Sequence, residues 1–495
     1  MKVGDMSAAR LLPQRARTKI VATVGPACNT PEMLEQMILA GVDVFRLNLA
    51  HGELDEHSRV ATTIREISER LKRPVATLAD LSGPKIRLGT LVQDPIYCVE
   101  EQMYRFIRGD VATEPNELVS NYEPLIDEVK VGDNVMLADG TITMEVVEKT
   151  EDSVTCVVVA GGILRSRQGI NLPGTKLGVE TITPRDRDHI RWAAETDLDY
   201  VSLSFVREAD DIRQLKDLLQ AHESRAMVIA KIEKREALDN LEEIVEVSNG
   251  VMVARGDLGV EIDVAEVAAA QKLIVKTCTR IGRPVIVATQ MLDSMTKNSR
   301  PTRAEATDVA NAILDGADAC MLSQETAVGE HPIVVIKMMN RIMLATEKML
   351  CEDLSNAIRG EEIGLVHPVT QAVVSGATRT ADLLNAKLMV MATRTGGTAL
   401  TKAKIRDCIA TIGVSDSKAA LRRMSLYWGI IPIDGAPVHN GIQLRRFVDK
   451  WGFEAGLLKP NDRVVFVTGG GIMQSAEYIV VVHKVEAPEG YGVTE

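Results

Sequence analysis

Continuously apolar segments alternate with amphipathic segments over roughly the first 350 residues. A short apolar run is typical of a strand that is covered on both faces, and apolar residues three and four positions apart are typical of a helix. The strand-like segments are 18–24, 43–49, 74–81, 199–205, 227–232, 250–254, 284–288 and 318–322. The helix-like segments between them include 31–40 (after the N-cap residue Thr30), 57–71, one from about 210, 265–280 and 302–314. This order predicts an α/β fold with a parallel sheet.

Eight such strands are the number that closes a (β/α)8 TIM barrel. A doubly wound open sheet is the alternative. Neither a G-x-G-x-x-G motif after the first strand nor a P-loop favours that alternative. We therefore expect a barrel catalytic domain that is built from residues 1–86 and 172–350.

Two further units interrupt and follow the barrel pattern. Residues 87–171 show short β patterns separated by turn signals such as Asp139-Gly140, which predicts an inserted all-β domain. After a helix at 333–350, a third unit at 351–495 has a helix to Leu384 and then further strand patterns. These strands are expected at 387–392, 409–414, 429–432, 463–467 and 479–485. The third unit is therefore expected to be a smaller α/β domain.

Composition excludes several classes of protein. The net charge of −12 argues against a broad nucleic-acid-binding surface. The chain has no apolar run of about 18 residues, so no membrane span is expected, and residues 1–17 lack the pattern of a signal peptide. The seven cysteines are scattered without a C-x-x-C motif, which predicts reduced, buried thiols in a cytoplasmic protein rather than a disulfide frame or a zinc site.

Polar and charged residues gather where the predicted strands end, which in (β/α)8 barrels is the active-site face. In the clearest case the strand 251–254 is expected to lead into a polar loop with Arg255, Gly256 and Asp257. The other strand ends carry Arg46, Asn48, His51, Asp80, Lys85, Arg87, Lys231, Glu233, Thr289, Ser323 and Glu325. Carboxylates beside several cations and hydroxyls predict a site for a phosphate or other oxyanion together with a divalent metal.

Several long motifs run along the chain: 17–26 (RTKIVATVGP), 45–48 (FRLN), 83–87 (GPKIR), 169–174 (GINLPG), 252–261 (MVARGDLGVE), 288–295 (ATQMLDSM), 300–305 (RPTRAE), 308–318 (DVANAILDGAD) and 321–327 (MLSQETA). On these motifs the chain resembles the pyruvate kinase family along nearly its whole length. The resemblance implies a barrel domain, an inserted β-barrel that acts as a lid, and a C-terminal domain for regulation and assembly. It also implies a homotetramer that converts phosphoenolpyruvate and ADP to pyruvate and ATP.

The resemblance further implies roles for the charged residues. Glu233 and Asp257 hold Mg²⁺ (or Mn²⁺), and Lys231 stabilises the transferring phosphoryl group and the enolate. Arg46 binds the phosphate of phosphoenolpyruvate, a contact that suits a guanidinium. The alternatives are a structural ion pair between Lys231 and Glu233 and a salt bridge of Arg46 at the barrel rim.

Other residues are implied to bind the substrate carboxylate, the proton and the nucleotide. The backbone N–H groups implied for the carboxylate are those of Ala254, Arg255, Gly256 and Asp257. Thr289 binds substrate and helps to deliver a proton through water near Ser323 and Glu325, unless Ser323 is a helix cap. The residues implied for ADP are Arg87, His51 and Asn48, with a hinge ion pair as the alternative for Arg87.

The chain departs from the family where many relatives bind K⁺. The positions that match the K⁺ ligands are Asn48, Ala50, Asp80 and Leu81, so a serine and a threonine hydroxyl are missing. Lys85 stands where those relatives have a glutamate. An ammonium would supply the positive charge and repel a bound cation. We therefore expect activity without K⁺.

Further departures lie outside this region. Gln168 replaces the lysine that contacts the nucleotide in relatives, and Gln324 replaces a glycine. The loop 393–398 resembles a sugar-phosphate or nucleotide effector site, but Gly397 and the segment 468–474 differ from the usual pattern. Two other functions stay open: an Mg²⁺-dependent lyase that forms a pyruvate enolate, and a non-catalytic regulatory paralogue.

Overall fold

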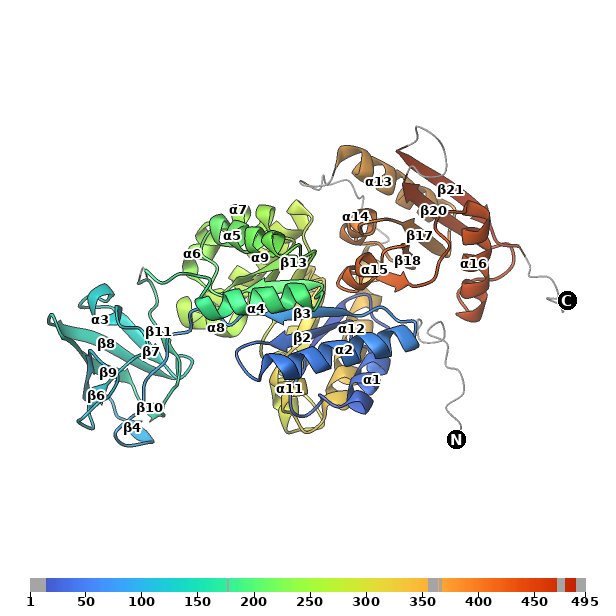
Figure 1. Cartoon of the computed structure of the whole chain (residues 1–495). Helices are drawn as coiled ribbons and strands as arrows, with labels where there is room; N and C mark the ends of the chain where they lie inside the picture. Colours follow the sequence, from blue (N-terminus) through green and yellow to red (C-terminus); the bar gives the residue numbers. More distant parts are fainter. Residues whose placement is uncertain (1–14, 176–177, 355–363, 365–366, 470–476, 487–495) are drawn as a thin grey trace.

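The computed structural model of the chain describes residues 15–175, 178–354, 364, 367–469 and 477–486. Three units follow one another in space: a β-rich insert, a central barrel and a C-terminal α/β unit (Figure 1). The insert and the C-terminal unit lie on opposite sides of the barrel. The predicted fold class is confirmed.

The barrel is closed by eight strands, and every neighbouring pair is parallel. In order around the barrel they are β1 (Lys19–Thr23), β2 (Val44–Asn48), β3 (Ala76–Asp80), β12 (Tyr200–Leu203), β13 (Met227–Ile232), β14 (Gly250–Ala254), β15 (Val285–Ala288) and β16 (Ala319–Leu322). Each overlaps one strand expected from the sequence. Closure excludes the open doubly wound sheet.

Helices surround the barrel. They are α1 (Pro31–Ala40), α2 (Leu54–Arg70), α4 (Pro184–Glu195), α5 (Ala209–Ala221), α6 (Arg235–Asp239), α7 (Leu241–Val247), α8 (Arg255–Glu261), α9 (Val267–Ile281), α10 (Arg303–Asp315), α11 (Gln324–Ala327) and α12 (Pro332–Leu354). The Thr30 side chain accepts from the Met33 N–H, so the predicted cap of α1 is confirmed. Two expectations were wrong: α2 begins before His57, and the polar loop expected after Ala254 is the short helix α8.

Side chains alternate between the barrel interior and the helices, because successive strand residues point to opposite faces. One layer inside the barrel is apolar: Val21, Val44, Leu78, Tyr200, Ile229, Met252, Ile286 and Met321. Two residues further along each strand, at the carboxyl end, the same face carries Thr23, Arg46, Asp80, Ser202, Lys231, Ala254, Ala288 and Ser323. The apolar layer therefore closes the floor beneath a polar layer.

The β-rich insert has its own apolar core. Its strands are β4 (Ile96–Cys98), β5 (Met103–Ile107), β6 (Glu117–Leu118), β7 (Asn134–Leu137), β8 (Ile142–Lys149), β9 (Ser153–Ala160), β10 (Gly162–Leu164) and β11 (Ile170–Asn171), with one short helix, α3 (Leu125–Glu128). Six of them form the sheet β11-β7-β8-β9-β5-β6, and β10 pairs with β4. This sheet is an open half-barrel with β11 and β6 at its edges, rather than the closed barrel that the resemblance implied.

The C-terminal unit has a five-stranded sheet in the order β19-β18-β17-β20-β21, in which β21 alone is antiparallel to its neighbour. Its elements are α13 (Pro368–Leu383), β17 (Leu388–Ala392), α14 (Gly397–Ile405), β18 (Thr411–Val414), α15 (Lys418–Met424), β19 (Ile430–Ile433), α16 (Gly441–Glu454), β20 (Arg463–Gly469) and β21 (Tyr478–Lys484). The predicted smaller α/β unit is confirmed. Most of the segment 468–474 lies outside the described residues.

The C-terminal unit contacts the end of the barrel where the strands begin. Lys19 Nζ donates to the carbonyl of Ile430 at 2.7 Å. The fully buried Asp318 pairs with Lys404 at 2.6 Å and with Arg406 at 3.1 Å. The C-terminal unit therefore lies at the opposite end of the barrel from the carboxyl ends of the strands.

The cysteine prediction was wrong for one pair. Cys351 on α12 and Cys408 after α14 form a disulfide with a Cα–Cα distance of 5.8 Å. The long helix α12 brings Cys351 to the C-terminal unit, a contact that the spacing of 57 residues does not reveal. Cys28, Cys98, Cys156, Cys278 and Cys320 are free and buried, as expected. Among the described residues, no helix is long and apolar enough to cross a membrane.

Candidate active site

A cavity of about 470 Å³ opens at the carboxyl ends of the barrel strands. It is lined by Thr23, Arg46, Asn48, His51, Asp80, Lys231, Met252, Ala254, Asp257, Ala288, Thr289, Met321, Ser323, Gln324, Ala327 and Val328. Most of the residues expected from the strand ends therefore share one cavity. Glu233, Arg255, Gly256, Glu325, Lys85 and Arg87 lie behind or beside it.

A buried ion pair network lies in the cavity above the apolar layer that closes its floor. Asp80 accepts from Arg46 Nε at 2.7 Å and lies 2.5 Å from Arg46 Nη2. The other oxygen of Asp80 lies 3.4 Å from Lys231 Nζ and accepts from Ser202 Oγ at 2.7 Å. Burial alone would raise the pKa of Asp80, but Lys231 and Arg46 outweigh burial and hold that pKa below its ordinary value. Asp80 is therefore a carboxylate shared by two cations.

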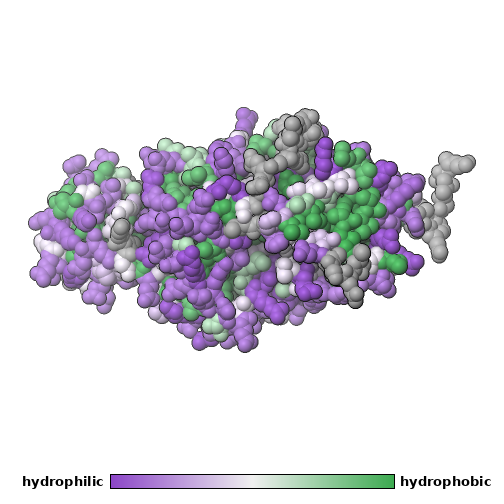
Figure 2. All heavy atoms as spheres, turned by 90° about the horizontal axis from the view of Figure 1, so that it is seen from above, coloured by the Kyte–Doolittle hydropathy of each residue, from purple (hydrophilic) through white to green (hydrophobic). Residues whose placement is uncertain are grey.

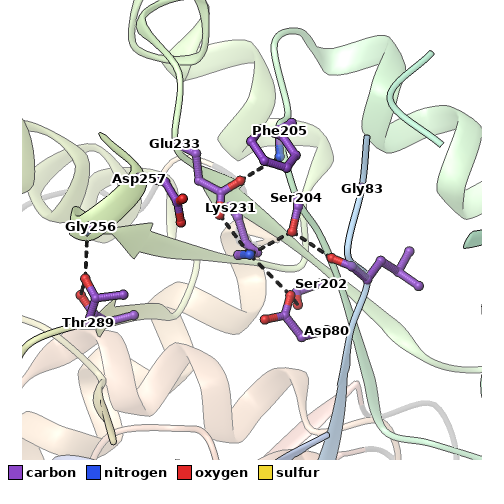
Figure 3. A network of polar contacts seen from close by, with 12 residues as sticks. Asp80, Gly83, Ser202, Ser204, Phe205, Lys231, Glu233, Gly256, Asp257 and Thr289 are labelled. Atoms are coloured by element: carbon purple, nitrogen blue, oxygen red, sulfur yellow. Dashed lines mark hydrogen bonds and ion pairs between the residues drawn. The ribbon is translucent and has the colours of Figure 1, made fainter. Parts of the chain in front are cut away.

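Lys231 is held by three acceptors on three sides (Figure 3). Its Nζ lies 2.8 Å from Glu233 Oε1 and donates to Ser204 Oγ at 2.7 Å, in addition to the contact with Asp80. Burial alone would lower the pKa of Lys231, but the carboxylates of Asp80 and Glu233 outweigh burial and raise it above its ordinary value. The ammonium is therefore charged and fixed in direction.

Glu233 and Asp257 come from the ends of the adjacent strands β13 and β14. Glu233 is almost fully buried, and its Oε2 accepts from the Phe205 N–H at 2.7 Å. Burial raises the pKa of Glu233, Lys231 opposes this, and the nearby negative charge of Asp257 raises it further. Two neighbouring carboxylates that repel each other are an oxygen donor set suited to a divalent cation. In the part of the chain that the structure describes, His, Cys, Asp and Glu form no cluster of three or more that could hold a metal.

Thr289 has an unusual backbone conformation at the edge of the cavity. Its φ of 68° lies in the left-handed region, which a β-branched residue rarely adopts, and Gln290 follows with a φ of 54°. The Thr289 hydroxyl accepts from the Gly256 N–H at 2.8 Å and donates to the carbonyl of Ala288 at 2.6 Å. This conformation fixes the hydroxyl beside the start of α8, so that the Gly256 N–H expected to face a substrate carboxylate is bonded to Thr289.

The side chain of Arg255 points away from the cavity. Its Nη1 pairs with Asp308 at 2.7 Å, while Nε and Nη2 donate to the carbonyls of Ala288 and Thr289 at 3.2 and 2.6 Å. Only the backbone of Arg255 belongs to the strand end. Its side chain fastens the turn after β15 to helix α10.

Ser323 and Glu325 lie at different depths. Ser323 lines the cavity and stands at the N-cap position of α11, where its side chain makes no capping hydrogen bond. Glu325 is buried behind it and accepts from the backbone N–H groups of Ser323 and Leu292 at 2.6 and 3.2 Å. Burial raises the pKa of Glu325. Glu325 therefore fixes the backbone of Ser323.

Lys85 and Arg87 lie where the barrel meets the insert. Lys85 Nζ lies 4.0 Å from Asp257 and 4.0 Å from Asp139 of the insert, whereas the expectation was a position beside Asn48 and Asp80. Arg87 donates to the carbonyl of Arg167 at 3.2 Å, which is a hydrogen bond at the junction and not the ion pair of the alternative. Gly83 precedes them with a φ of 63°, and a Cβ there would lie 2.8 Å from the Phe205 ring. The glycine is therefore required for this close approach.

The sequence-based prediction gave no role to three hydroxyls of the site. Ser202 and Ser204 hold Asp80 and Lys231, and Thr23 Oγ1 accepts from Arg46 Nη1 at 3.0 Å. The alternation of Ser202 and Ser204 around Leu203 is a signal that could have found two of them, because residues two apart on a strand share a face.

Fold and site together define a barrel enzyme that is built for an anionic substrate. A family model described as the barrel domain of pyruvate kinase matches residues 15–336, and one described as its alpha/beta domain matches residues 371–482. The chain belongs to the pyruvate kinase family, and it is a phosphotransferase with pyruvate kinase function.

Three relatives illustrate the similarity. The pyruvate kinase of Geobacillus stearothermophilus is 40% identical over 92% of this chain and 78% of its own length. The pyruvate kinase of Thermotoga maritima is 39% identical over 91% of this chain and 96% of its own. The crystal structure of a pyruvate kinase from Cryptosporidium parvum superimposes with a TM-score of 0.87 at 31% identity, covering 96% of this chain and 97% of that one.

Proposed function

We propose that the cavity transfers the phosphoryl group of phosphoenolpyruvate to ADP, with Lys231 and Arg46 as the cations that bind the transferring group. The observation that carries the proposal is the buried, charged Lys231, which is 9% exposed and directed by three acceptors. Phosphoryl transfer requires neutralisation of charge and accurate positioning rather than a covalent intermediate. A fixed ammonium in a site of low dielectric meets both requirements.

Each cation has a separate task in this proposal. Lys231 stabilises negative charge on the phosphoryl group in flight and on the enolate oxygen that it leaves. Arg46 binds the phosphate of the incoming phosphoenolpyruvate. Asp80 orients both cations by its contacts of 2.5 to 3.4 Å.

Glu233 and Asp257 are the residues that would hold Mg²⁺ or Mn²⁺. The donor set fits, since it consists of two hard carboxylates whose mutual repulsion a divalent cation would relieve. A bound divalent cation would neutralise charge on the substrate oxygens. The substrate carboxylate would lie near the start of α8, with Thr289 beside it.

Proton delivery to the enolate carbon completes the reaction. Thr289 and Ser323 both line the cavity, and the pKa of an aliphatic hydroxyl is too high for a main acid. We infer that a water chain past these hydroxyls supplies the proton. Glu325 supports this chain by holding the backbone of Ser323.

The nucleotide would bind between the barrel and the insert. His51 and Asn48 line the cavity, and Arg87 and Lys85 lie at the junction with the insert. Closure of the insert over the cavity would bring Arg87 to the ADP phosphates. Residues 87–171 are thus proposed as the lid, 1–86 with 172–350 as the catalytic domain, and 351–495 as the regulatory and assembly domain.

We also propose that K⁺ is not required. The support is that Asp80, which matches a K⁺ ligand in relatives, is paired with Arg46 and Lys231, while Lys85 adds positive charge beside Asp257. Activity in K⁺-free tetramethylammonium buffer tests this, and a strict K⁺ requirement would contradict it. The triple variant Lys85→Glu, Leu81→Thr, Ala50→Ser should gain K⁺ dependence.

A homotetramer and an effector loop at 393–398 are further proposals. An apolar area covers part of the C-terminal unit (Figure 2). Exposed apolar side chains in this unit include Leu383 on α13 and Val480 and Val482 on the edge strand β21. Such a surface supports assembly through the C-terminal unit. Light scattering would measure the mass of the assembly, and a monomer would contradict the proposal.

A coupled assay for pyruvate, with phosphoenolpyruvate and Mg²⁺ in the presence and absence of ADP, tests the reaction. Pyruvate formation that depends on ADP and yields one ATP per pyruvate is expected. Pyruvate formation without ADP would mean that water accepts the phosphoryl group, and it would contradict the kinase. Nucleotide binding without turnover would favour the non-catalytic paralogue.

A further inference from the structure

Two buried hydroxyls hold the two cations of the site in the same way. Ser204 Oγ donates to the carbonyl of Leu81 at 2.7 Å and accepts from Lys231 Nζ at 2.7 Å. A hydroxyl has one proton, so the bond to the carbonyl leaves only acceptor lone pairs for the ammonium. The main chain that follows β3 therefore fixes Ser204 as an acceptor for Lys231.

Thr23 repeats the arrangement on the other side of Asp80. Its Oγ1 donates to the carbonyl of Leu322 at 3.0 Å and accepts from Arg46 Nη1 at 3.0 Å. Thr23 is 3% exposed and Ser204 is 2% exposed, so water does not compete for either bond. In both cases the neighbouring strand orients the hydroxyl, and the hydroxyl orients the cation.

The other acceptors of Lys231 are less available during the reaction. Glu233 is shared with the divalent cation in the proposed function. Asp80 is the most distant acceptor, at 3.4 Å, and it also binds Arg46 and Ser202. Ser204 is therefore the acceptor whose bond to Lys231 does not compete with another cation.

A neutral acceptor differs from a carboxylate in its effect on the site. A carboxylate directs a cation but also cancels part of its charge, which weakens the attraction to a phosphate oxygen. A hydroxyl directs the cation and leaves its charge available to the substrate. Arg46 likewise has Asp80 on two of its nitrogens and the Thr23 hydroxyl on the third.

We propose that Ser204 and Thr23 are positioning residues, Ser204 for Lys231 in the transfer step and Thr23 for Arg46 in binding phosphoenolpyruvate. This inference rests on the proposed function of the two cations. It predicts that the two hydroxyls affect different kinetic constants, because Lys231 acts most strongly in the transition state and Arg46 already acts on the bound substrate.

The expected effects follow from the strength of a hydrogen bond to a charged group. Ser204→Ala should lower kcat about 10- to 100-fold and leave KM for phosphoenolpyruvate within about threefold of wild type. Thr23→Val, which keeps the shape of threonine, should raise that KM about tenfold and leave kcat within about threefold. Thr23→Ser restores the hydroxyl and should return KM to within about threefold of wild type.

Steady-state kinetics of these variants with phosphoenolpyruvate, ADP and Mg²⁺ is the test. Ser248→Ala is the control for Ser204, since Ser248 is fully buried and donates to the carbonyl of Ile244 at 2.6 Å outside the cavity. Thr346→Val is the control for Thr23, since Thr346 donates to the carbonyl of Ile342 at 2.9 Å on α12. Both controls should keep wild-type constants, and thermal unfolding of every variant reports folding.

The outcomes separate this inference from the proposed function. An inactive wild-type enzyme would refute the proposed function. An active wild type with both constants of Ser204→Ala and Thr23→Val within twofold of wild type would overturn the positioning role. The positioning role would also be overturned if Thr23→Ser raised KM as much as Thr23→Val. It would be overturned as well if the control variants changed kcat or KM as much as the test variants. If Ser204→Ala does not fold, the Thr23 variants decide alone.

Discussion

Replacement of Lys231 by methionine removes the ammonium and keeps an unbranched side chain that is one atom shorter. The change deletes the contacts with Ser204 at 2.7 Å, Glu233 at 2.8 Å and Asp80 at 3.4 Å. Methionine fills a comparable volume, so no large cavity is expected. The variant therefore isolates the charge.

The expected loss of activity is large. Removing one neutral donor to a developing oxyanion costs about 10²- to 10³-fold in kcat. Lys231 is a full positive charge in a buried site, so its loss should cost about 10³-fold or more. This factor corresponds to about 4 kcal/mol of transition-state stabilisation.

The expected loss of stability is smaller, because the carboxylates keep other partners. Breaking a buried ion pair by removing one partner costs about 3–5 kcal/mol. Asp80 keeps Arg46 and Ser202, and Glu233 keeps the Phe205 N–H. We therefore expect a destabilisation near the lower end, about 3 kcal/mol.

Initial rates with ADP and Mg²⁺ would measure the first effect, and urea unfolding followed by circular dichroism the second. Lys418→Met is the matched control, since Lys418 and its partner Glu69 are both exposed and a surface salt bridge contributes about 0–1 kcal/mol. A folded Lys231→Met enzyme with kcat within about tenfold of wild type would refute the reasoning.

Three further predictions concern the other units. The disulfide of Cys351 and Cys408 joins residues 57 apart, so loop-closure entropy predicts a stabilisation of about 4 kcal/mol. Dithiothreitol should lower the urea unfolding midpoint of the wild type but not that of Cys351→Ser. A wild-type midpoint that is equal with and without reductant would contradict this prediction. Asp318→Ala leaves Lys404 and Arg406 buried without their carboxylate. We expect the free energy of unfolding to fall by about 3–5 kcal/mol, and proteolysis between the barrel and the C-terminal unit to become faster. Unchanged unfolding would show that Asp318 does not stabilise the contact between the two units. Hydrogen bonds from the Thr113 N–H and then from Arg105 lower the pKa of Glu117 from the ordinary 4.5 to about 2, so the stability that Glu117 contributes is present above pH 4.5 and is lost as the pH falls toward 2. Glu117→Gln should therefore lower the unfolding midpoint of the insert at pH 7, and the difference from wild type should vanish toward pH 2. A difference that stays constant with pH would contradict this prediction.

The fold was readable from the sequence because its signals are local. A strand buried on both faces must be continuously apolar, and a helix against it must be apolar at every third or fourth position. Thr30 marks the start of α1 by a hydrogen bond from the N–H group three residues later, and the structure has this bond. The start of α2 was misplaced because Glu53 precedes it without a side-chain cap.

The site was readable in part. The side chains that point inward at strand ends, such as Arg46, Asp80 and Lys231, follow from the alternation of the strand together with closure of the barrel. The direction of the Arg255 side chain could not be predicted from the strand pattern, because α8 starts directly after Ala254 and turns this side chain toward Asp308. The position of Lys85 could not be predicted either, because it depends on how the insert is placed relative to the barrel.

The amino-acid sequence is enough to predict the order of strands and helices, the division into three units and the set of charged residues at the strand ends. Tertiary structure alone decided how those charges pair: that Asp80 serves both Arg46 and Lys231, and that Ser204 and Thr23 complete their coordination. It also decided that Cys351 meets Cys408. The physical reason is the separation along the chain over which each kind of interaction acts. Apolar periodicity acts between neighbours in the chain, whereas an ion pair or hydrogen bond depends on distances of about 3 Å between residues that only the closed barrel and its docked units bring together.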